Sequence, residues 1–196
     1  MDLEGVLVPE IWINVAEATG VDELRATTRD IPDYDELMAQ RLRLLDEHNL
    51  DMDAIRSVIG DMGPMEGAKA FLDELRGKYQ VVILSDTFYE FARPLMRQLD
   101  WPTLFCHRLE TDGDGVITGY RLRMADHKRE AVKSFKALNF RVTAAGDSYN
   151  DTNMLSEADA GILFRAPKNV IDQFPQFPVV ETYEELLSAI AVPAEG

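Results

Sequence analysis

Asp2-Leu3-Glu4-Gly5, at the start of the chain, and Gly146-Asp147-Ser148-Tyr149-Asn150-Asp151, far along it, are the stretches that decide the fold. Each carries acidic residues where a strand ends or is expected to end. The ends of parallel strands meet at one edge of a doubly wound sheet, so we expect both stretches to converge there. Converging carboxylates repel one another unless a hard cation lies between them, and Mg²⁺ binds one or two carboxylates together with phosphate. The pair predicts one Mg²⁺ site and a carboxylate that can accept a phosphoryl group.

Composition and charge limit the classes of partner. The chain has 196 residues, 46% of them hydrophobic, which suits one large domain or a core domain with a small insertion. Its formal net charge of −15 argues against nucleic acid or an anionic membrane as the main partner, because both require a basic surface. The only cysteine, Cys106, excludes an intrachain disulfide and favours a reducing compartment. We expect a cytoplasmic protein without a signal peptide or a membrane span.

Hydrophobic periodicity predicts strands that alternate with helices after residue 80. Val81-Val82-Ile83-Leu84 is a short apolar run that ends in Ser85-Asp86, which is typical of a buried parallel strand. We expect further strands near 103–106, 141–145, 161–164 and 179–180, and helices over 9–20, 34–47, 52–61, 66–77, 88–98, 127–138, 151–157, 168–173 and 183–191. A hairpin is expected over 107–124, around Asp112-Gly113-Asp114-Gly115. This alternation indicates an α/β fold with a doubly wound parallel sheet.

Residues 12–64 interrupt the alternation. The segment contains only helical patterns, so we interpret it as a small helical cap inserted after the first motif, on a core domain formed by residues 1–11 and 65–196. A sheet of this kind is expected to begin with an apolar strand that leads into Asp2, yet only Met1 precedes it. We therefore expect the first core strand to be truncated, which would leave Asp2 and Glu4 loosely held.

The motifs together resemble those of the haloacid dehalogenase-like (HAD-like) hydrolase superfamily. Its signatures are Asp-x-Asp-x-(Thr/Val), a strand-end Ser or Thr, a Lys, and Gly-Asp-x-x-x-Asp. They stand here as Asp2-Leu3-Glu4-Gly5-Val6, Ser85, Lys128, and Gly146-Asp147-Ser148-Tyr149-Asn150-Asp151. Within the superfamily, the chain is similar to the phosphoserine phosphatase branch, which has a small helical cap. It most resembles the bacterial bifunctional type, in which Glu replaces the second Asp of the first motif, as at Glu4, and which also transfers the phosphoryl group from phosphoserine to homoserine.

The resemblance assigns the acidic residues to one Mg²⁺-dependent reaction. Asp2 would be the nucleophile, which forms an aspartyl phosphate, and also a Mg²⁺ ligand. Glu4 would offer a backbone carbonyl to the metal and act as general acid and base, for which a raised pKa would help. Asp147 would be the third protein ligand, and Asp151 would support the ligands from behind.

The resemblance also implies residues that hold the phosphoryl group. Ser85 and Lys128 would contact its oxygens, and Lys128 would offset the negative charge of the site. Asn150 and the backbone of Ser85-Asp86 would complete the substrate contacts. From the residues alone, the less favoured alternative for Lys128 is a solvated lysine at the start of a helix, beside Arg129.

Arg41 and Glu10 are the candidates for the amino-acid part of the substrate. Arg41 lies on an apolar stripe, four residues from both Leu37 and Leu45, and a cation in that position is usually paired. The resemblance places there an arginine that binds the substrate carboxylate, and matches Glu10 to an acid that binds the amine. The alternatives are an arginine whose charged end snorkels to solvent, and a glutamate that complements a helix dipole.

We therefore expect a phosphoserine phosphatase, with homoserine as a second acceptor, that serves serine and threonine biosynthesis. The sequence does not show whether hydrolysis or transfer to homoserine is the physiological task. It also does not show whether the protein forms a homodimer. One alternative is a phosphatase for another small phosphomonoester. A second is a catalytically silent HAD-like binding protein, which is favoured by the short segment before Asp2. A receiver-type signalling domain also phosphorylates an Asp on a doubly wound sheet, but it would lack the helical segment 12–64.

Three other features carry no predicted function. Asp112-Gly113-Asp114-Gly115 faintly resembles a Ca²⁺ loop but lacks its later ligands, so it is interpreted as a turn. Cys106 sits in an apolar strand and is expected in the core. His48, His107 and His127 are dispersed, without the spacing of metal ligands.

Overall fold

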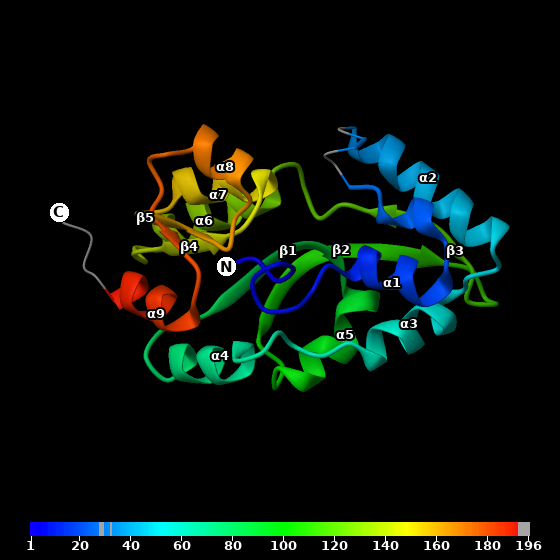
Figure 1. Ribbon diagram of the computed structural model, residues 1–196, viewed down its shortest axis with the longest axis horizontal. Helices are drawn as coiled ribbons and strands as arrows, with labels where there is room; N and C mark the ends of the chain where they lie inside the picture. The colour runs from blue at the N-terminus through cyan, green and yellow to red at the C-terminus, as the bar shows by residue number, and fades with distance from the viewer. Residues whose placement is uncertain (28–29, 32, 192–196) are drawn as a thin grey trace.

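Two three-stranded sheets lie at the centre of the molecule, which the computed structural model describes over residues 1–27, 30–31 and 33–191 (Figure 1). The strand orders are β1-β2-β3 and β4-β5-β6. The strands are β1 (Val82–Phe88), β2 (Thr103–Thr111), β3 (Ile117–Arg121), β4 (Thr143–Gly146), β5 (Ala160–Phe164) and β6 (Val179–Val180). Neighbouring strands are parallel except β2 and β3, which form the antiparallel hairpin predicted around residues 112–115. The predicted α/β fold with parallel strands is confirmed.

The start of the chain joins the two sheets between β1 and β4. The Met1 ammonium donates a hydrogen bond to the Val82 carbonyl (3.0 Å), and the Met1 carbonyl accepts one from the Leu84 N–H (2.9 Å). On the other side, the Asp2 N–H donates to the Ala145 carbonyl (2.9 Å). These bonds fix Asp2 beside the ends of both strands, and the residue is only 4% exposed. The expectation that Asp2 would be loosely held was therefore wrong.

The helices of the expected core domain form close to their predicted positions. They are α4 (Ala68–Arg76), α5 (Tyr89–Gln98), α6 (His127–Ala137), α7 (Thr152–Glu157), α8 (Lys168–Gln173) and α9 (Tyr183–Ala191), with a short 3₁₀ helix at Tyr149–Asp151. In α4, the predicted apolar face is buried and packs in the core. Figure 1 shows α6, α7 and α8 gathered around β4 and β5. In the part of the chain that the structure describes, no helix is long and apolar enough to cross a membrane.

The segment predicted as a cap contains α1 (Ile11–Thr19), a 3₁₀ helix at Asp22–Arg25, α2 (Tyr34–Glu47) and α3 (Met52–Asp61). Figure 1 shows α1, α2 and α3 together at the end of the molecule opposite α9. Asp33 and Asp51 start α2 and α3, because their carboxylates accept the N–H groups of Glu36 and Ala54. Residues 28, 29 and 32 lie outside the described residues, and the division at residues 12 and 64 stays a prediction.

A groove continues the gap between β1 and β4 on the far side of Met1 from the acidic residues. It is a cavity of about 540 Å³ with a mostly apolar lining. Residues 80–82 and 141–145 form its two long sides, and side chains of α4, α6 and α9 close it. In the described part of the chain, the groove holds no strand, so β1 and β4 face each other across it.

We expect an extended apolar segment joined to Met1 to enter this groove. A strand directs its N–H and C=O groups alternately to two sides, so the residue before Met1 would bond with β4 and the preceding one with β1. The segment would also replace the Met1 ammonium, whose pKa burial lowers to about 6, with a neutral peptide group. Four β-branched residues fused before Met1 should raise the free energy of unfolding by about 3 kcal/mol, and the Tm by roughly 6–12 °C.

A Gly-Ser segment of the same length is the matched control, because it adds backbone without apolar side chains. Calorimetry of the two fusions measures the difference. Equal melting temperatures for both fusions would contradict the pairing of a strand in this groove.

Candidate active site

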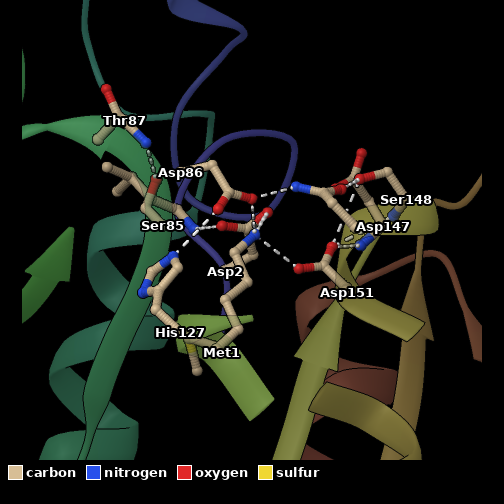
Figure 2. A network of polar contacts seen from close by, with 12 residues as sticks. Met1, Asp2, Ser85, Asp86, Thr87, His127, Asp147, Ser148 and Asp151 are labelled. Atoms are coloured by element: carbon tan, nitrogen blue, oxygen red, sulfur yellow. Dashed lines mark hydrogen bonds and ion pairs between the residues drawn. The ribbon is translucent and has the colours of Figure 1, made fainter. Parts of the chain in front are cut away.

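An acidic cluster lies at the carboxyl ends of β1 and β4. Asp2 stands where the chain joins the sheets, Asp147 follows β4, and Asp151 ends the next 3₁₀ helix. Carboxylate oxygens of the three residues lie within 4.8 Å of one another. Figure 2 shows Asp2 beside Asp147 and Asp151 in one polar network. The two acidic stretches of the sequence are thus brought together.

Two glycines permit this close approach. Gly5 has a positive φ of 72°, and a Cβ atom on it would lie 2.4 Å from Asp147 Oδ2. A Cβ atom on Gly146 would lie equally close to the carboxylate of Asp151. Any larger residue at either position would therefore displace a carboxylate of the cluster.

Backbone N–H groups orient two of the carboxylates. Asp2 Oδ1 accepts the N–H of Leu3 (2.7 Å). Asp151 Oδ2 accepts the N–H groups of Asp147 (3.1 Å) and Ser148 (3.3 Å), and Asp151 is fully buried. Because Asp151 is engaged in this way, it is suited to the supporting position predicted for it, which stays a prediction.

Lys128 lies in the middle of the carboxylates. Its Nζ atom is 3.2 Å from Asp2 Oδ2, 3.0 Å from Asp86 Oδ2 and 2.9 Å from Asp151 Oδ1. Burial alone would lower the pKa of Lys128, but these charges raise it well above its usual range. Lys128 is 2% exposed, so the alternative of a solvated lysine is wrong.

The cluster carries more negative charge than Lys128 balances. Burial and the neighbouring charge of Asp151 raise the pKa of Asp2 well above its ordinary value. The same two causes raise the pKa of Asp147 to about 7. A divalent cation would relieve this repulsion, and a set of carboxylate oxygens is the ligand chemistry that suits Mg²⁺. The residues present therefore fit the predicted metal, with Asp2 and Asp147 as its expected ligands.

Ser85 and Asp86 reach the cluster from the middle of β1. Ser85 is 1% exposed, and its Oγ atom accepts the N–H of Thr87 (3.2 Å). Asp86 Oδ2 accepts a hydrogen bond from Asn150 Nδ2 (2.6 Å) as well as the contact with Lys128. The predicted phosphoryl-binding residues are therefore all near the acidic cluster.

Glu4 lies in a second group of residues, toward α1. Its Oε2 atom accepts the N–H of Ile11, the first residue of α1 (2.9 Å). Burial and the neighbouring Glu10 raise the pKa of Glu4 to about 8, against the opposing effects of the Ile11 N–H and Arg41. The carboxyl group is thus protonated near neutral pH, as a general acid requires. The predicted use of its backbone carbonyl stays a prediction.

Arg41 lies on α2, is 7% exposed, and belongs to the same group as Glu4. Its Nη2 atom donates to the Ala26 carbonyl (2.9 Å), and the guanidinium carbon lies 4.5 Å from the centre of the Trp12 ring. Its Nε atom is buried without a partner among the described residues. Burial lowers the pKa of Arg41 to about 10, although the charges of Tyr34 and Glu4 oppose the change. Because Arg41 is buried, its charged end does not reach solvent, which contradicts the snorkelling alternative. The unpaired N–H at Nε suits an anionic ligand.

Two histidines lie beside the site, and no pattern in the sequence indicates them. His107, on β2, and His127, the first residue of α6, both approach Asp86. They are far apart in sequence and show no shared motif, so no spacing signal could reveal them. Only the adjacency of β1, β2 and the start of α6 brings them together.

The raised carboxyl pKa values predict an unusual pH dependence of stability. A carboxyl group whose pKa is raised by folding holds its proton more tightly when folded, so its stabilisation is lost as pH rises toward the folded pKa. For Asp147 and Glu4, those values are about 7 and about 8. Without divalent cations, the free energy of unfolding should fall by about 2–3 kcal/mol between pH 5 and pH 6. Burial of the Met1 ammonium acts in the opposite direction only between about pH 6 and 8.

Urea unfolding at a series of pH values, in a chelator and in excess Mg²⁺, measures this effect. Mg²⁺ favours the ionised carboxylates, so it should abolish the fall. The variant Asp147→Asn should lose part of the dependence in the chelator. Stability that rises from pH 5 to pH 6 without divalent cations would contradict the prediction.

The chain is similar to several known proteins. A model of the haloacid dehalogenase-like hydrolase family matches residues 1–159. Phosphoserine phosphatase ThrH of Pseudomonas aeruginosa is 66% identical over 186 residues, which cover 95% of this chain and 91% of that protein. A phosphoserine phosphatase of Pseudomonas syringae pv. tomato is 65% identical over 186 residues, which cover 95% and 78%.

A solved structure extends the likeness to three dimensions. The crystal structure of phosphoserine phosphatase from T. onnurineus, in complex with NDSB-201, matches with a TM-score of 0.74 and 26% identity, over 96% of this chain and 91% of that one. The family match covers most of the chain and includes both acidic stretches. This chain belongs to the haloacid dehalogenase-like hydrolase family.

Proposed function

We propose that this protein is a Mg²⁺-dependent phosphoserine phosphatase that acts through a phosphorylated Asp2, and that it also transfers the phosphoryl group to homoserine. The observation that carries the proposal is the convergence of Asp2, Lys128 and Asp147 in a buried site, in a chain 66% identical to a named phosphoserine phosphatase. The expected partner is a small molecule, L-phosphoserine. A homodimer stays an open prediction.

In the first half-reaction, a carboxylate oxygen of Asp2 attacks phosphorus and the bond from phosphorus to the serine oxygen breaks. Mg²⁺, held by Asp2, Asp147 and the backbone carbonyl of Glu4, would neutralise charge on the phosphoryl oxygens. Ser85 and Lys128 hold the same oxygens in line. The protonated carboxyl group of Glu4 gives its proton to the departing serine oxygen.

In the second half-reaction, an acceptor attacks the aspartyl phosphate. Glu4, now ionised, takes the proton of the attacking hydroxyl group, and Asp2 is released. Water yields phosphate, and the hydroxyl group of homoserine yields phosphohomoserine. Glu4 serves both acceptors in the same way, so the cap that closes the site sets the proportion between them.

The amino-acid part of the substrate would lie toward the cap. Arg41 would bind its carboxylate through the open Nε donor and a terminal nitrogen, and Glu10 would bind its ammonium group. Asn150 and the backbone of Asp86 would complete the contacts. A phosphatase for another phosphomonoester, or a silent binding protein, are the competing functions.

The deciding assay measures phosphate release from L-phosphoserine with Mg²⁺, with and without homoserine, and detects phosphohomoserine by mass spectrometry. Release with phosphohomoserine supports both activities, and release alone supports a phosphatase only. No release from this chain, nor from the chain with an apolar segment before Met1, would favour the competing functions.

The substitution Asp2→Asn should remove the nucleophile. We expect kcat for phosphoserine to fall by a factor on the order of 10⁴–10⁶, and the phosphorylated enzyme to disappear from acid-quenched samples analysed by mass spectrometry. Asp22→Asn, at an exposed position in the 3₁₀ helix, is the control and should leave both unchanged. Full activity of Asp2→Asn would show that another residue is phosphorylated.

The substitution Arg41→Ala should raise the KM for phosphoserine. Loss of a buried charge partner costs about 2–4 kcal/mol, which corresponds to roughly 30- to 1000-fold. Arg41→Lys keeps the charge but loses the paired donors, so it should recover only part of the affinity. Phosphoethanolamine has no carboxylate and is the control substrate: kcat/KM for it should be the same in Arg41→Ala and the wild type. An equal loss for both substrates would contradict carboxylate binding by Arg41.

A further inference from the structure

Two buried histidines, His107 and His127, lie beside one carboxylate oxygen of Asp86, and the proposed reaction does not use them. His127 Nε2 lies 3.0 Å from Asp86 Oδ1, and His107 Nε2 lies 3.5 Å from the same atom. Both histidines are 4% exposed, and their ring centres are 4.5 Å apart. Figure 2 shows Asp86 and Asp2 between His127 on one side and Asp147 and Asp151 on the other.

The hydrogen bonds of His107 determine which of its nitrogens carries the proton. The backbone N–H of Arg123 donates to His107 Nδ1 (3.2 Å), so Nδ1 is an acceptor and the ring N–H is on Nε2. This nitrogen is the one that lies 3.5 Å from Asp86 Oδ1. The three side chains lie close enough to hold a metal ion, but a metal at Nε2 would need the lone pair that this proton occupies. The geometry therefore favours a hydrogen-bond donor.

His127 supports the same arrangement. Its Nδ1 atom is buried without a partner in the described part of the chain. A buried N–H without a partner is rarer than a buried acceptor without one, so the proton belongs on Nε2, where Asp86 receives it. His127 thus donates to Asp86 Oδ1, and the protonated nitrogen of His107 lies 3.5 Å from the same oxygen.

Asp86 differs from the other two carboxylates that contact Lys128. Asp2 and Asp151 are oriented by backbone N–H groups, whereas the hydrogen bonds to the Asp86 carboxylate all come from side chains in the described structure. Its side chain is also the most exposed of the three, at 35%. Burial alone would raise the pKa of Asp86, but the charge of Lys128 and the histidine and Asn150 hydrogen bonds hold it well below its usual range.

We propose that His107 and His127 are positioning residues that orient Asp86, so that Asp86 holds Lys128 and Asn150 at the phosphoryl site. The proposal rests on the proposed function. His127 binds Oδ1 and His107 lies beside the same oxygen, which leaves Oδ2 toward Lys128 (3.0 Å) and Asn150 (2.6 Å). Without the histidines, the Asp86 carboxylate can rotate away from Lys128. Lys128 then pairs more closely with Asp2 and weakens the negative charge with which Asp2 attacks phosphorus.

Single substitutions test the role of each imidazole. His127→Leu and His107→Leu should each lower kcat about 10- to 100-fold, with little change in KM. His127→Gln and His107→Gln should recover most of the rate, because the glutamine amide can donate from a similar position. His48→Leu, at an exposed position after α2, is the control and should retain full activity. Leu variants with wild-type kcat, or Gln variants no better than Leu, would overturn the proposal.

A double substitution tests whether the histidines act through Asp86. In an Asp86→Asn background, His127→Leu should lower kcat by less than twofold, since the group that it orients is already altered. An undiminished effect in that background would overturn the proposal. So would activation of the wild type by added Zn²⁺ that both Leu variants abolish, because it would identify a metal site.

Measurements on the unmodified protein separate this proposal from the proposed function. Activity on p-nitrophenyl phosphate serves as a second readout if phosphoserine is not the substrate. Nitrogen-15 NMR of the imidazole rings reports the protonated nitrogen in the wild type, even if no phosphoester is hydrolysed or the variants fail to fold. Protons on Nε2 of both rings, with a Lys128 ammonium signal that is protected from solvent exchange, support the proposal. A proton on Nδ1 of His107 would overturn it.

Discussion

The balance of charge around Lys128 is the constraint on which the site depends. Its ammonium group lies within 3.2 Å of Asp2, Asp86 and Asp151, and Asp147 adds a fourth carboxylate nearby. One lysine cannot neutralise four carboxylates, two of them buried, so burial together with the charge of Asp151 raises the pKa of Asp2 and Asp147. Such repulsion is tolerated where a ligand supplies the missing positive charge. The charge of the cluster is therefore an argument for the proposed divalent cation that does not depend on any family likeness.

The fold meets this constraint largely with backbone groups. Backbone hydrogen bonds from Met1 to β1 and from Asp2 to β4 fix the position of Asp2. The N–H groups just after β4 fix the carboxylate of Asp151. Gly5 and Gly146 leave the space that the carboxylates occupy. Asp86 is the exception because side chains hold it, so its orientation is the part of the site that substitution can change without disturbing the sheet.

The sequence predicted what local patterns encode. Periodicity located the helices and strands within a few residues, because each buries one continuous apolar face, and strand-end motifs located Asp2, Ser85 and Asp147. It could not predict what depends on tertiary contacts. Met1 pairs with β1 and Asp2 with β4, and His107 and His127 meet only because β2 and α6 are neighbours of β1. The wrong expectation of a loosely held Asp2 came from judging a strand by its length rather than by its hydrogen bonds.

The two halves of the site are held in place by different parts of the fold. This difference affects the proposed choice of acceptor. The phosphoryl half is built on the sheet, where hydrogen bonds from the backbone leave little freedom. The half around Arg41 and Glu4 depends on α2 and the start of α1, and among the described residues the guanidinium contacts the Ala26 carbonyl, Met38 Sδ and the ring of Trp12. A change in the position of α2 would therefore alter how an amino-acid acceptor binds while leaving Asp2 and Lys128 in place. In the proposed reaction, the position of α2 would therefore affect the partition between water and an alcohol acceptor, while Asp2 and Lys128 would hold the phosphoryl group in the same way for both acceptors.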